Sequence, residues 1–376
     1  MTALKELSEL AKEPYSSAVR DWKERGGKVV GFTCSYFPEE ILHAAGILPY
    51  RLSPTNCTET TEADAYMSNF NCTFARGCLQ LALKGDYAFL DGIVLMNSCD
   101  HLRRLYDNWK SLSNSPYAHY LSVPHRVGEG PEGWYKSELT MFKESLEAAF
   151  SVKIIEESLV NSINTYNRIR SLLKQIYELR KRRKPPIKSS EMMKVIVAGF
   201  RSPKEVYAQL LMKLLSELEE EKEMPDSRAR LMLMGGACDN ADFVQVIEDA
   251  GGSVVADTLC FGSRYFWNTV EPAGDSISIL AKFYLNNPSC ARMTGSQSER
   301  WRFAKEMLQQ YKVDGIIVQR LKWCDLWGGE AFYLGEMIKD LGVPFLLLER
   351  EYWLSGEEQL KTRVQALVEV IEGRRR

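Results

Sequence analysis

The sequence predicts an α/β protein made of two similar Rossmann-like lobes with parallel sheets, joined by a helical segment. In both halves of the chain, short apolar runs alternate with amphipathic stretches at helical spacing, which is typical of parallel sheets covered by helices. Two stretches nearly repeat one another, LDGIVLMNSCDHLRRLYDNW from Leu90 and VDGIIVQRLKWCDLWGGEAF from Val313. We therefore expect an N-terminal lobe over residues 1–150, a helical segment over 151–225 and a C-terminal lobe over 226–376.

The N-terminal lobe is expected to begin with a buried strand over Lys28–Thr33, followed by a turn, a short helix and a second strand. Pro38 suits the first turn of that helix, and the two glutamates after it stand where the helix dipole favours anions. Gly46 suits the C-terminal end of the helix. The runs YAFLDGIVLM and YAHYLSVP predict two further strands.

The middle segment contains SLVNSINTYNRIRSLLKQIYELRKRRKPP and SPKEVYAQLLMKLLSELEEEKEMP, which are both amphipathic at helical spacing. The basic run Lys181–Lys184 between them is better explained as the solvated C-terminus of a helix than as a polyanion site. In the C-terminal lobe, RLMLMGGACD, GGSVVADTLCFGSRYF, VDGIIVQRLKWCD and GVPFLLLERE each predict a strand.

The composition argues against several classes of protein. The formal net charge of the 376 residues is −2, so nothing calls for a nucleic acid or an anionic membrane as partner. No apolar run approaches the ~20 residues needed to span a bilayer. The start MTALKELSELAKEPYSSAVRDW is charged and does not look like a signal peptide. We expect a cytoplasmic protein.

Nine cysteines are many for such a protein: Cys34, Cys57, Cys72, Cys78, Cys99, Cys238, Cys260, Cys290 and Cys324. An odd number in a reducing compartment makes a disulfide framework an unsuitable explanation. The absence of any CxxC argues against zinc ribbons, thioredoxin-type pairs and ferredoxin-type cluster motifs. The remaining explanations are inert buried thiols or a metal site assembled from cysteines distant in sequence.

Two of these cysteines stand where parallel sheets bind their ligands, beyond the carboxyl ends of strands. Cys99 follows the predicted strand Ile93–Met96, and Cys324 follows Ile316–Val318. Each is at or just before a helix N-terminus, where backbone N–H groups and the dipole stabilise a thiolate.

Three further cysteines have comparable positions. Cys34 and Cys260 also follow strands, and Cys72 lies where Asn71 or Ser68 would cap a helix. If the two lobes face each other, several thiols converge, and few histidines accompany them. That donor set favours a soft metal, and an iron–sulfur cluster fits better than zinc. Packed core thiols remain the alternative.

Several stretches of the sequence are uncommon motifs: CSYFPEEILHAAGILPYRL, CTFARGCLQL, DGIVLMNSCDHLRRLYDNW, DTLCFGSRYF, QRLKWCDLWGGEAF and PFLLLEREY. In this order they resemble the 2-hydroxyacyl-CoA dehydratase / benzoyl-CoA reductase superfamily, and SCDHLRRLYDNW, LCFGSRYF and LEREY look more like its benzoyl-CoA reductase branch. The resemblance implies one of two related subunits, each of which holds a [4Fe-4S] cluster through three cysteines. It also implies a separate ATP-hydrolysing iron–sulfur activator, and an acyl-CoA substrate that is reduced to a ketyl-type radical.

By the same resemblance, Cys72 and Cys324 match cluster ligands. The third ligand is either Cys34 or Cys99, because one subunit type uses the first position and the other type the second. Three cysteines would leave one iron open to a thioester oxygen, as catalytic metals keep an open position. The chain has no GxxxxGK[ST], so ATP is expected to be hydrolysed by the partner.

Two candidates for catalysis, Glu40 and His43, lie on the predicted helix that follows Cys34. Glu40 would be a proton donor, with a purely electrostatic role in the first helical turn as the alternative. His43 would be a second catalytic group, or else a buried and satisfied histidine. Asp100 and Asp325, directly after their cysteines, are expected to cap helices.

Candidates for substrate binding lie in both lobes. Arg103 and Arg104 form a cationic group with His101 that suits the phosphates or carboxylate of a CoA thioester, or a solvent face. Arg264 and Tyr265 follow a strand end and would line the substrate pocket. Three aromatic residues are expected to surround Cys324 and keep its site dry, unless they are ordinary packing: Trp323, Trp327 and Phe332.

The resulting hypotheses belong to different classes. The first is a cluster-bearing subunit of an ATP-dependent benzoyl-CoA reductase-type enzyme, with a subunit of an (R)-2-hydroxyacyl-CoA dehydratase as alternative. The second is an electron-relay subunit without a substrate site. The third, a nucleotide-binding α/β protein with structural cysteines, is weakened because no strand is followed by GxGxxG.

Overall fold

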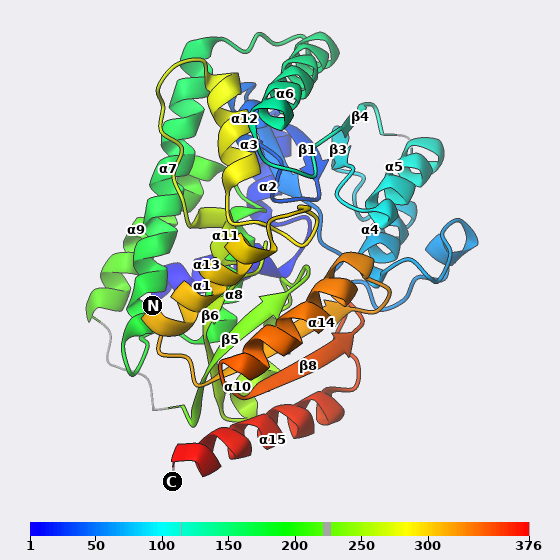
Figure 1. Cartoon of the computed structure of the whole chain (residues 1–376). Coiled ribbons are helices and arrows are strands. Elements are labelled where there is room, and N and C mark those ends of the chain that lie inside the picture. Colours follow the sequence, from blue (N-terminus) through cyan, green and yellow to red (C-terminus); the bar gives the residue numbers. More distant parts are fainter. Residues whose placement is uncertain (114, 221–226, 376) are drawn as a thin grey trace.

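Two four-stranded parallel sheets form the centre of the molecule, and the predicted fold class is confirmed (Figure 1). The computed structural model describes residues 1–113, 115–220 and 227–375. The first sheet has the order β2-β1-β3-β4 and consists of β1 (Lys28–Phe32), β2 (Ile47–Arg51), β3 (Gly92–Met96) and β4 (Ala118–Leu121). The second has the order β6-β5-β7-β8 and consists of β5 (Ala229–Gly235), β6 (Gly252–Asp257), β7 (Gly315–Leu321) and β8 (Phe345–Arg350).

Both sheets have the same topology. In each, the second strand pairs with one edge of the first, and the chain then returns to the opposite edge. The strand order therefore reverses between β1 and β3, and again between β5 and β7. Ligands of such sheets bind in the crevice beyond the carboxyl ends of these strands.

Helices cover both sheets. Those that begin in the first 150 residues are α1 (Thr2–Lys12), α2 (Ser17–Glu24), α3 (Glu39–Ala44), η1 (Ala63–Ala65), α4 (Thr73–Leu83), α5 (Asp100–Leu112) and α6 (Glu129–Phe150). The middle of the chain contains α7 (Glu156–Glu178), η2 (Leu179–Lys181), α8 (Ser189–Gly199) and α9 (Lys204–Glu220). The remainder are α10 (Ala241–Asp249), α11 (Ser263–Phe266), α12 (Ser276–Asn286), α13 (Gln297–Gln310), α14 (Asp325–Asp340) and α15 (Glu357–Arg375).

The repeated Asp-Gly motif has the same structural role in both lobes. Asp91 accepts a hydrogen bond from the backbone N–H of Val29 at 2.9 Å, and Asp314 accepts one from Arg230 at 2.7 Å. Each carboxylate thus fixes the start of the neighbouring central strand. The glycine that follows is needed for space, because a Cβ at Gly92 would lie 2.8 Å from the Cβ of Tyr117.

The turn after β1 follows the sequence closely. α3 begins one residue after Pro38, which is its N-cap, and Gly46 follows the helix with φ +71°. A left-handed conformation at this position suits glycine, which lacks the Cβ that disfavours it. β2 starts immediately afterwards.

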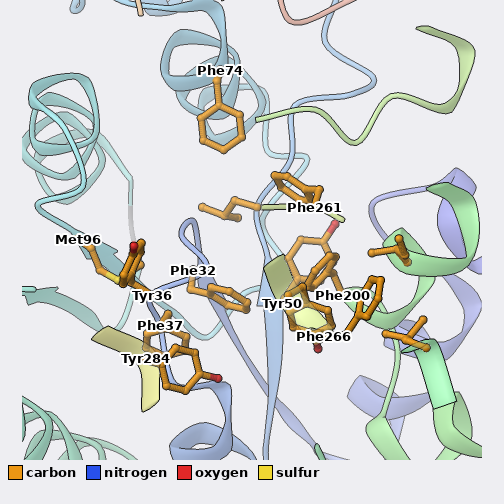
Figure 2. Packing of buried hydrophobic residues seen from close by; sticks show 14 of the residues in the cluster. Phe32, Tyr36, Phe37, Tyr50, Phe74, Met96, Phe200, Phe261, Phe266 and Tyr284 are labelled. Atoms are coloured by element: carbon orange, nitrogen blue, oxygen red, sulfur yellow. The ribbon is translucent and has the colours of Figure 1, made fainter. Parts of the chain in front are cut away.

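The two lobes are interlocked. α1 packs against α8 and α9, and α6 packs against α12. One large hydrophobic core extends through both sheets, and Figure 2 shows Phe32 and Tyr50 of the first sheet in the same cluster as Phe261 and Phe266, which follow β6. The predicted boundary at residue 150 stays a prediction, and the one at 225–226 lies outside the described residues. Within the described part of the chain, no helix is long and apolar enough to cross a membrane.

Candidate functional site

Three cysteines occupy the N-cap positions of three helices. Cys72 precedes α4, Cys99 precedes α5 and Cys324 precedes α14. The prediction that Asn71 or Ser68 caps α4 is wrong, because the helix begins immediately after the cysteine.

The prediction that the two aspartates cap α5 and α14 is also wrong. Asp100 and Asp325 are the first residues of their helices, and neither N-cap makes a side-chain capping bond. Both carboxylates are exposed, where the positive end of the helix dipole still favours them.

A histidine joins the three helix N-termini. The backbone N–H of Cys72 donates to Nδ1 of His101 at 3.2 Å, and Nε2 of His101 lies 3.9 Å from Oδ2 of Asp325. Burial lowers the pKa of His101, which favours the neutral ring. Because Nδ1 accepts the N–H of Cys72, the proton of the neutral ring is on Nε2, which faces Asp325 of the other lobe. α4, α5 and α14 accordingly lie on the same side of the molecule (Figure 1).

The three thiols influence one another electrostatically. Burial raises the pKa of all three, and for Cys99 the charges of Cys72 and Cys324 raise it further. The pKa of Cys324 reaches about 12, with Cys72 as the second cause after burial. N–H groups of the first helical turns act in the opposite direction. Three thiolates here would need a positive charge between them, which a soft metal group supplies.

Thiols are the donor type that iron–sulfur clusters use. Among the described residues, no group of three or more His, Cys, Asp and Glu side chains is placed to hold one metal ion. Three thiols from separate helix N-termini, with backbone N–H groups directed at the sulfurs, match what cluster ligation uses.

Cys34, the other candidate for the third ligand, has different neighbours. Its carbonyl accepts from the N–H of Phe37 at 3.1 Å, and its charge acts on Tyr135 of α6. The thiols that act on Cys99 are Cys72 and Cys324. Cys99 is thus the candidate whose thiol interacts electrostatically with Cys72 and Cys324, and the identity of the third ligand stays a prediction.

The two catalytic candidates lie in internal contacts. Glu40 is fully buried, and its Oε1 lies 2.6 Å from Nη2 of Arg170 while the hydroxyl of Tyr284 donates to Oε2 at 2.7 Å. The ring nitrogens of His43 contact Ser162 and Glu205, both at 2.9 Å. These contacts favour structural roles, and a role in catalysis stays a prediction for both.

The four candidates for substrate binding are divided between surface and interior. Arg103 and Arg104 are exposed on α5, where Arg104 lies 3.7 Å from Asp100. Arg264 and Tyr265 are buried on α11, and neither side chain has a hydrogen-bond partner among the described residues.

The aromatic residues near Cys324 differ in exposure. Trp327 is buried and packs over Gly236, whereas Trp323 and Phe332 are exposed. The ring of Trp323 meets that of Phe70 edge to face at 4.9 Å, which connects the two lobes beside the cysteines. Trp323 has φ +65°, an unusual conformation for a non-glycine residue that turns the chain sharply before α14.

Sequence reasoning missed a second connection between the lobes. The backbone N–H of Tyr352 donates to Oγ1 of Thr73 at 2.8 Å, next to Cys72, and its hydroxyl donates to Asp239. Thr55 donates to the same carboxylate at 3.0 Å. Only the uncommon word LEREY pointed to this tyrosine, without indicating its contacts.

Comparisons with known proteins identify the family of this chain. The family model described as 2-hydroxyglutaryl-CoA dehydratase, D-component, matches residues 34–371. The chain belongs to this family. The matched region contains all three N-cap cysteines, and the resemblance noted from the sequence words is confirmed.

Named relatives of this dehydratase family match nearly the whole chain. The (R)-phenyllactyl-CoA dehydratase beta subunit of Clostridium sporogenes is 26% identical over 370 residues, which cover 97% of this chain and 98% of the relative. A subunit of the benzoyl-CoA reductase of Thauera aromatica is 27% identical over 338 residues, or 88% of each chain. The (R)-2-hydroxyglutaryl-CoA dehydratase beta subunit of Acidaminococcus fermentans is 22% identical over 377 residues, covering 97% and 98%. This chain is thus an enzyme subunit of the acyl-CoA dehydratase and benzoyl-CoA reductase type.

Proposed function

We propose that this chain is the iron–sulfur cluster-bearing subunit of a multi-subunit enzyme that acts on an acyl-CoA thioester. The observation that carries the proposal is the convergence of Cys72, Cys99 and Cys324 at three helix N-termini drawn from both lobes. These three residues would hold a [4Fe-4S] cluster. Bound in this way, the cluster would supply low-potential electrons and one iron position free of protein ligands.

The residues around the cysteines prepare the site for such a group. N–H groups of the first turns of α4, α5 and α14 stabilise negative charge on the sulfurs. Trp327, together with the Phe70–Trp323 pair, places apolar surface beside Cys324. His101 orients Cys72 through its backbone.

For the reaction, our first candidate is reduction of an aromatic acyl-CoA of the benzoyl-CoA reductase type, which the words SCDHLRRLYDNW and LCFGSRYF favour. The second is removal of water from an (R)-2-hydroxyacyl-CoA. It is favoured by the match to the phenyllactyl-CoA dehydratase subunit, which extends over 98% of that relative, whereas the match to the reductase subunit extends over 88%. A relay of electrons to a substrate on the partner is the third.

In each case the chain needs partners. A related cluster-binding subunit would complete the enzyme, and an ATP-hydrolysing iron–sulfur activator would reduce it, because the sequence has no P-loop. We expect the assembly to be cytoplasmic.

The reaction can be tested directly. The chain is purified without oxygen together with its related subunit, and activator, ATP and either benzoyl-CoA or (R)-phenyllactyl-CoA are added. ATP-dependent consumption of benzoyl-CoA would support the first candidate, and formation of an unsaturated acyl-CoA the second. If the complex turns over only when the partner's substrate site is intact, and this chain alone binds no acyl-CoA, the relay is supported.

His101 gives a prediction on its supporting role. His101→Leu removes the acceptor for the N–H of Cys72, whereas His101→Asn offers a carbonyl oxygen near the position of Nδ1. Loss of a group that orients a metal ligand weakens binding by about 10–100-fold. Release of iron to a chelator is expected to be faster by about that factor in the leucine variant and close to wild type in the asparagine variant. Equal release from both would contradict the role.

A further inference from the structure

Tyr352 belongs to the C-terminal lobe but is held by residues of the N-terminal lobe. It lies two residues after β8 and is 1% exposed. Its backbone N–H donates to Oγ1 of Thr73 at 2.8 Å, and its ring meets that of Phe74 edge to face at 5.2 Å. Thr73 and Phe74 are the first two residues of α4, directly after Cys72. The start of this helix is therefore tied to the other lobe beside the cysteine.

The hydroxyl end of Tyr352 is anchored by a buried carboxylate. The hydroxyl donates to Oδ1 of Asp239, which follows β5 and is 3% exposed. Oδ2 of Asp239 accepts from the hydroxyl of Ser53, and from that of Thr55 at 3.0 Å. Asp239 belongs to the C-terminal lobe, whereas the serine and the threonine belong to the N-terminal lobe. Because hydrogen bonds to an ionised group are stronger than neutral ones, this carboxylate joins the tyrosine firmly to both lobes.

The backbone of Tyr352 is fixed within its own lobe by Arg350. Nη1 of Arg350 donates to the carbonyl of Tyr352 at 2.9 Å, and Nε donates to Oε1 of Gln319, also at 2.9 Å. Gln319 is fully buried in β7, and Cys324 follows the end of this strand by three residues. The N–H of Cys324 donates to the carbonyl of Leu321, the last residue of β7, at 3.0 Å. The position of Tyr352 is thus coupled to the strand that ends beside Cys324.

These contacts form a continuous path between two of the proposed cluster ligands. The path runs from Cys72 to its neighbour Thr73, then to Tyr352 and Arg350, and ends at the strand before Cys324. Each of these side chains is buried or half-buried. Packing and hydrogen bonds of supporting residues keep a metal site within the narrow geometry that it needs. The path is therefore suited to fix the placement of one thiol relative to the other.

We propose that Tyr352 is a positioning residue, which holds Cys72 through Thr73 at a fixed place relative to Cys324. The thiols of the two lobes are then in place before a cluster binds, and less ordering is needed on binding. The inference rests on the proposed function, because it names residues that prepare both lobes for the cluster. Asp239 supports the same role by holding the hydroxyl of Tyr352.

Two substitutions of Thr73 separate this role from packing. Thr73→Val keeps the size and branching of the side chain but removes the acceptor for the N–H of Tyr352, whereas Thr73→Ser keeps the oxygen. Each chain is purified without oxygen, and release of iron to a chelator is followed. The valine variant is expected to release iron about 10–100-fold faster than the wild type, the usual effect of losing a group that orients a metal ligand. It is also expected to show changed g values in the EPR spectrum of the reduced chain. The serine variant is expected to resemble the wild type in both.

Tyr207→Phe is the control for a general loss of stability. Tyr207 is fully buried on α9, and its hydroxyl donates to the carbonyl of Val195 at 2.9 Å, away from α4 and α14 (Figure 1). This variant is expected to be less stable than the wild type, with the same iron release and EPR spectrum. Wild-type release and spectrum in Thr73→Val would overturn the positioning role. Release from Tyr207→Phe as fast as from Thr73→Val would also overturn it, because the rate would then report stability alone.

A second measurement does not need the cluster. Hydrogen–deuterium exchange of the iron-free chain is followed in peptides that contain Cys72 and Tyr352. Loss of one hydrogen bond of ordinary strength is expected to make both peptides of Thr73→Val exchange about tenfold faster, while Thr73→Ser exchanges like the wild type. Unchanged exchange in the valine variant would overturn the inference but not the proposed function. A wild type without iron would refute the proposed function, and the positioning role with it.

Discussion

Serine in place of Cys72, Cys99 or Cys324 is expected to abolish binding of the cluster. The wild type, purified without oxygen, is expected to contain about four irons per chain together with acid-labile sulfide. Each variant is expected to contain less than about one, because a hydroxyl is a poor ligand for this soft group and the two remaining thiols come from different helices. Iron and sulfide analysis of the purified chains gives the answer.

Two control variants make the result specific. Cys57→Ser should keep its iron, because Cys57 donates to the carbonyl of Glu59 and serine preserves that hydrogen bond. Cys34→Ser should also keep its iron, because the thiols that act on Cys99 are Cys72 and Cys324, whereas Cys34 acts on Tyr135. If Cys34→Ser loses the iron and Cys99→Ser retains it, Cys34 is the third ligand. A wild type without iron would remove the basis of the proposed function.

Arg170→Met is expected to destabilise the fold by about 3–5 kcal/mol, the usual cost of leaving a buried charge without its partner. Arg170 and Glu40 are 1% and 0% exposed, and they connect α7 to the first turn of α3. Removing the guanidinium leaves the carboxylate of Glu40 with the hydroxyl of Tyr284 and without a cation. Urea unfolding followed by circular dichroism measures the loss.

Further variants of this ion pair separate a structural role of Glu40 from a catalytic one. Arg168→Met, an exposed arginine on the same helix, should change stability by less than about 0.5 kcal/mol. The double variant Glu40→Gln with Arg170→Met should recover much of the lost stability, because no unpaired charge remains. If Arg170→Met unfolds like the wild type, the ion pair contributes little. A double variant that folds well but has lost all turnover would restore Glu40 as a catalytic candidate.

The strands were predictable because their signals are local. Each of the eight strands coincides with a short apolar run in the sequence. The Asp-Gly pair repeats because both lobes need the same carboxylate and the same small residue, at Asp91–Gly92 and Asp314–Gly315. The position of Cys99 and Cys324 beyond strand ends came from the same patterns. The helix caps were harder to predict from the sequence, because Asp next to Cys gives two possible starting residues one position apart.

The sequence by itself determined the fold class, the family and the set of cysteines from which a metal site would be drawn, because apolar periodicity and uncommon words are properties of neighbouring residues. Only the tertiary structure decided which thiols meet. Cys72, Cys99 and Cys324 are brought together by helices from two lobes, with His101 between them. The tertiary structure likewise paired Glu40 with Arg170 and placed Tyr352 against Thr73. Burial and charge pairing depend on contacts between distant parts of the chain, and no local pattern records them.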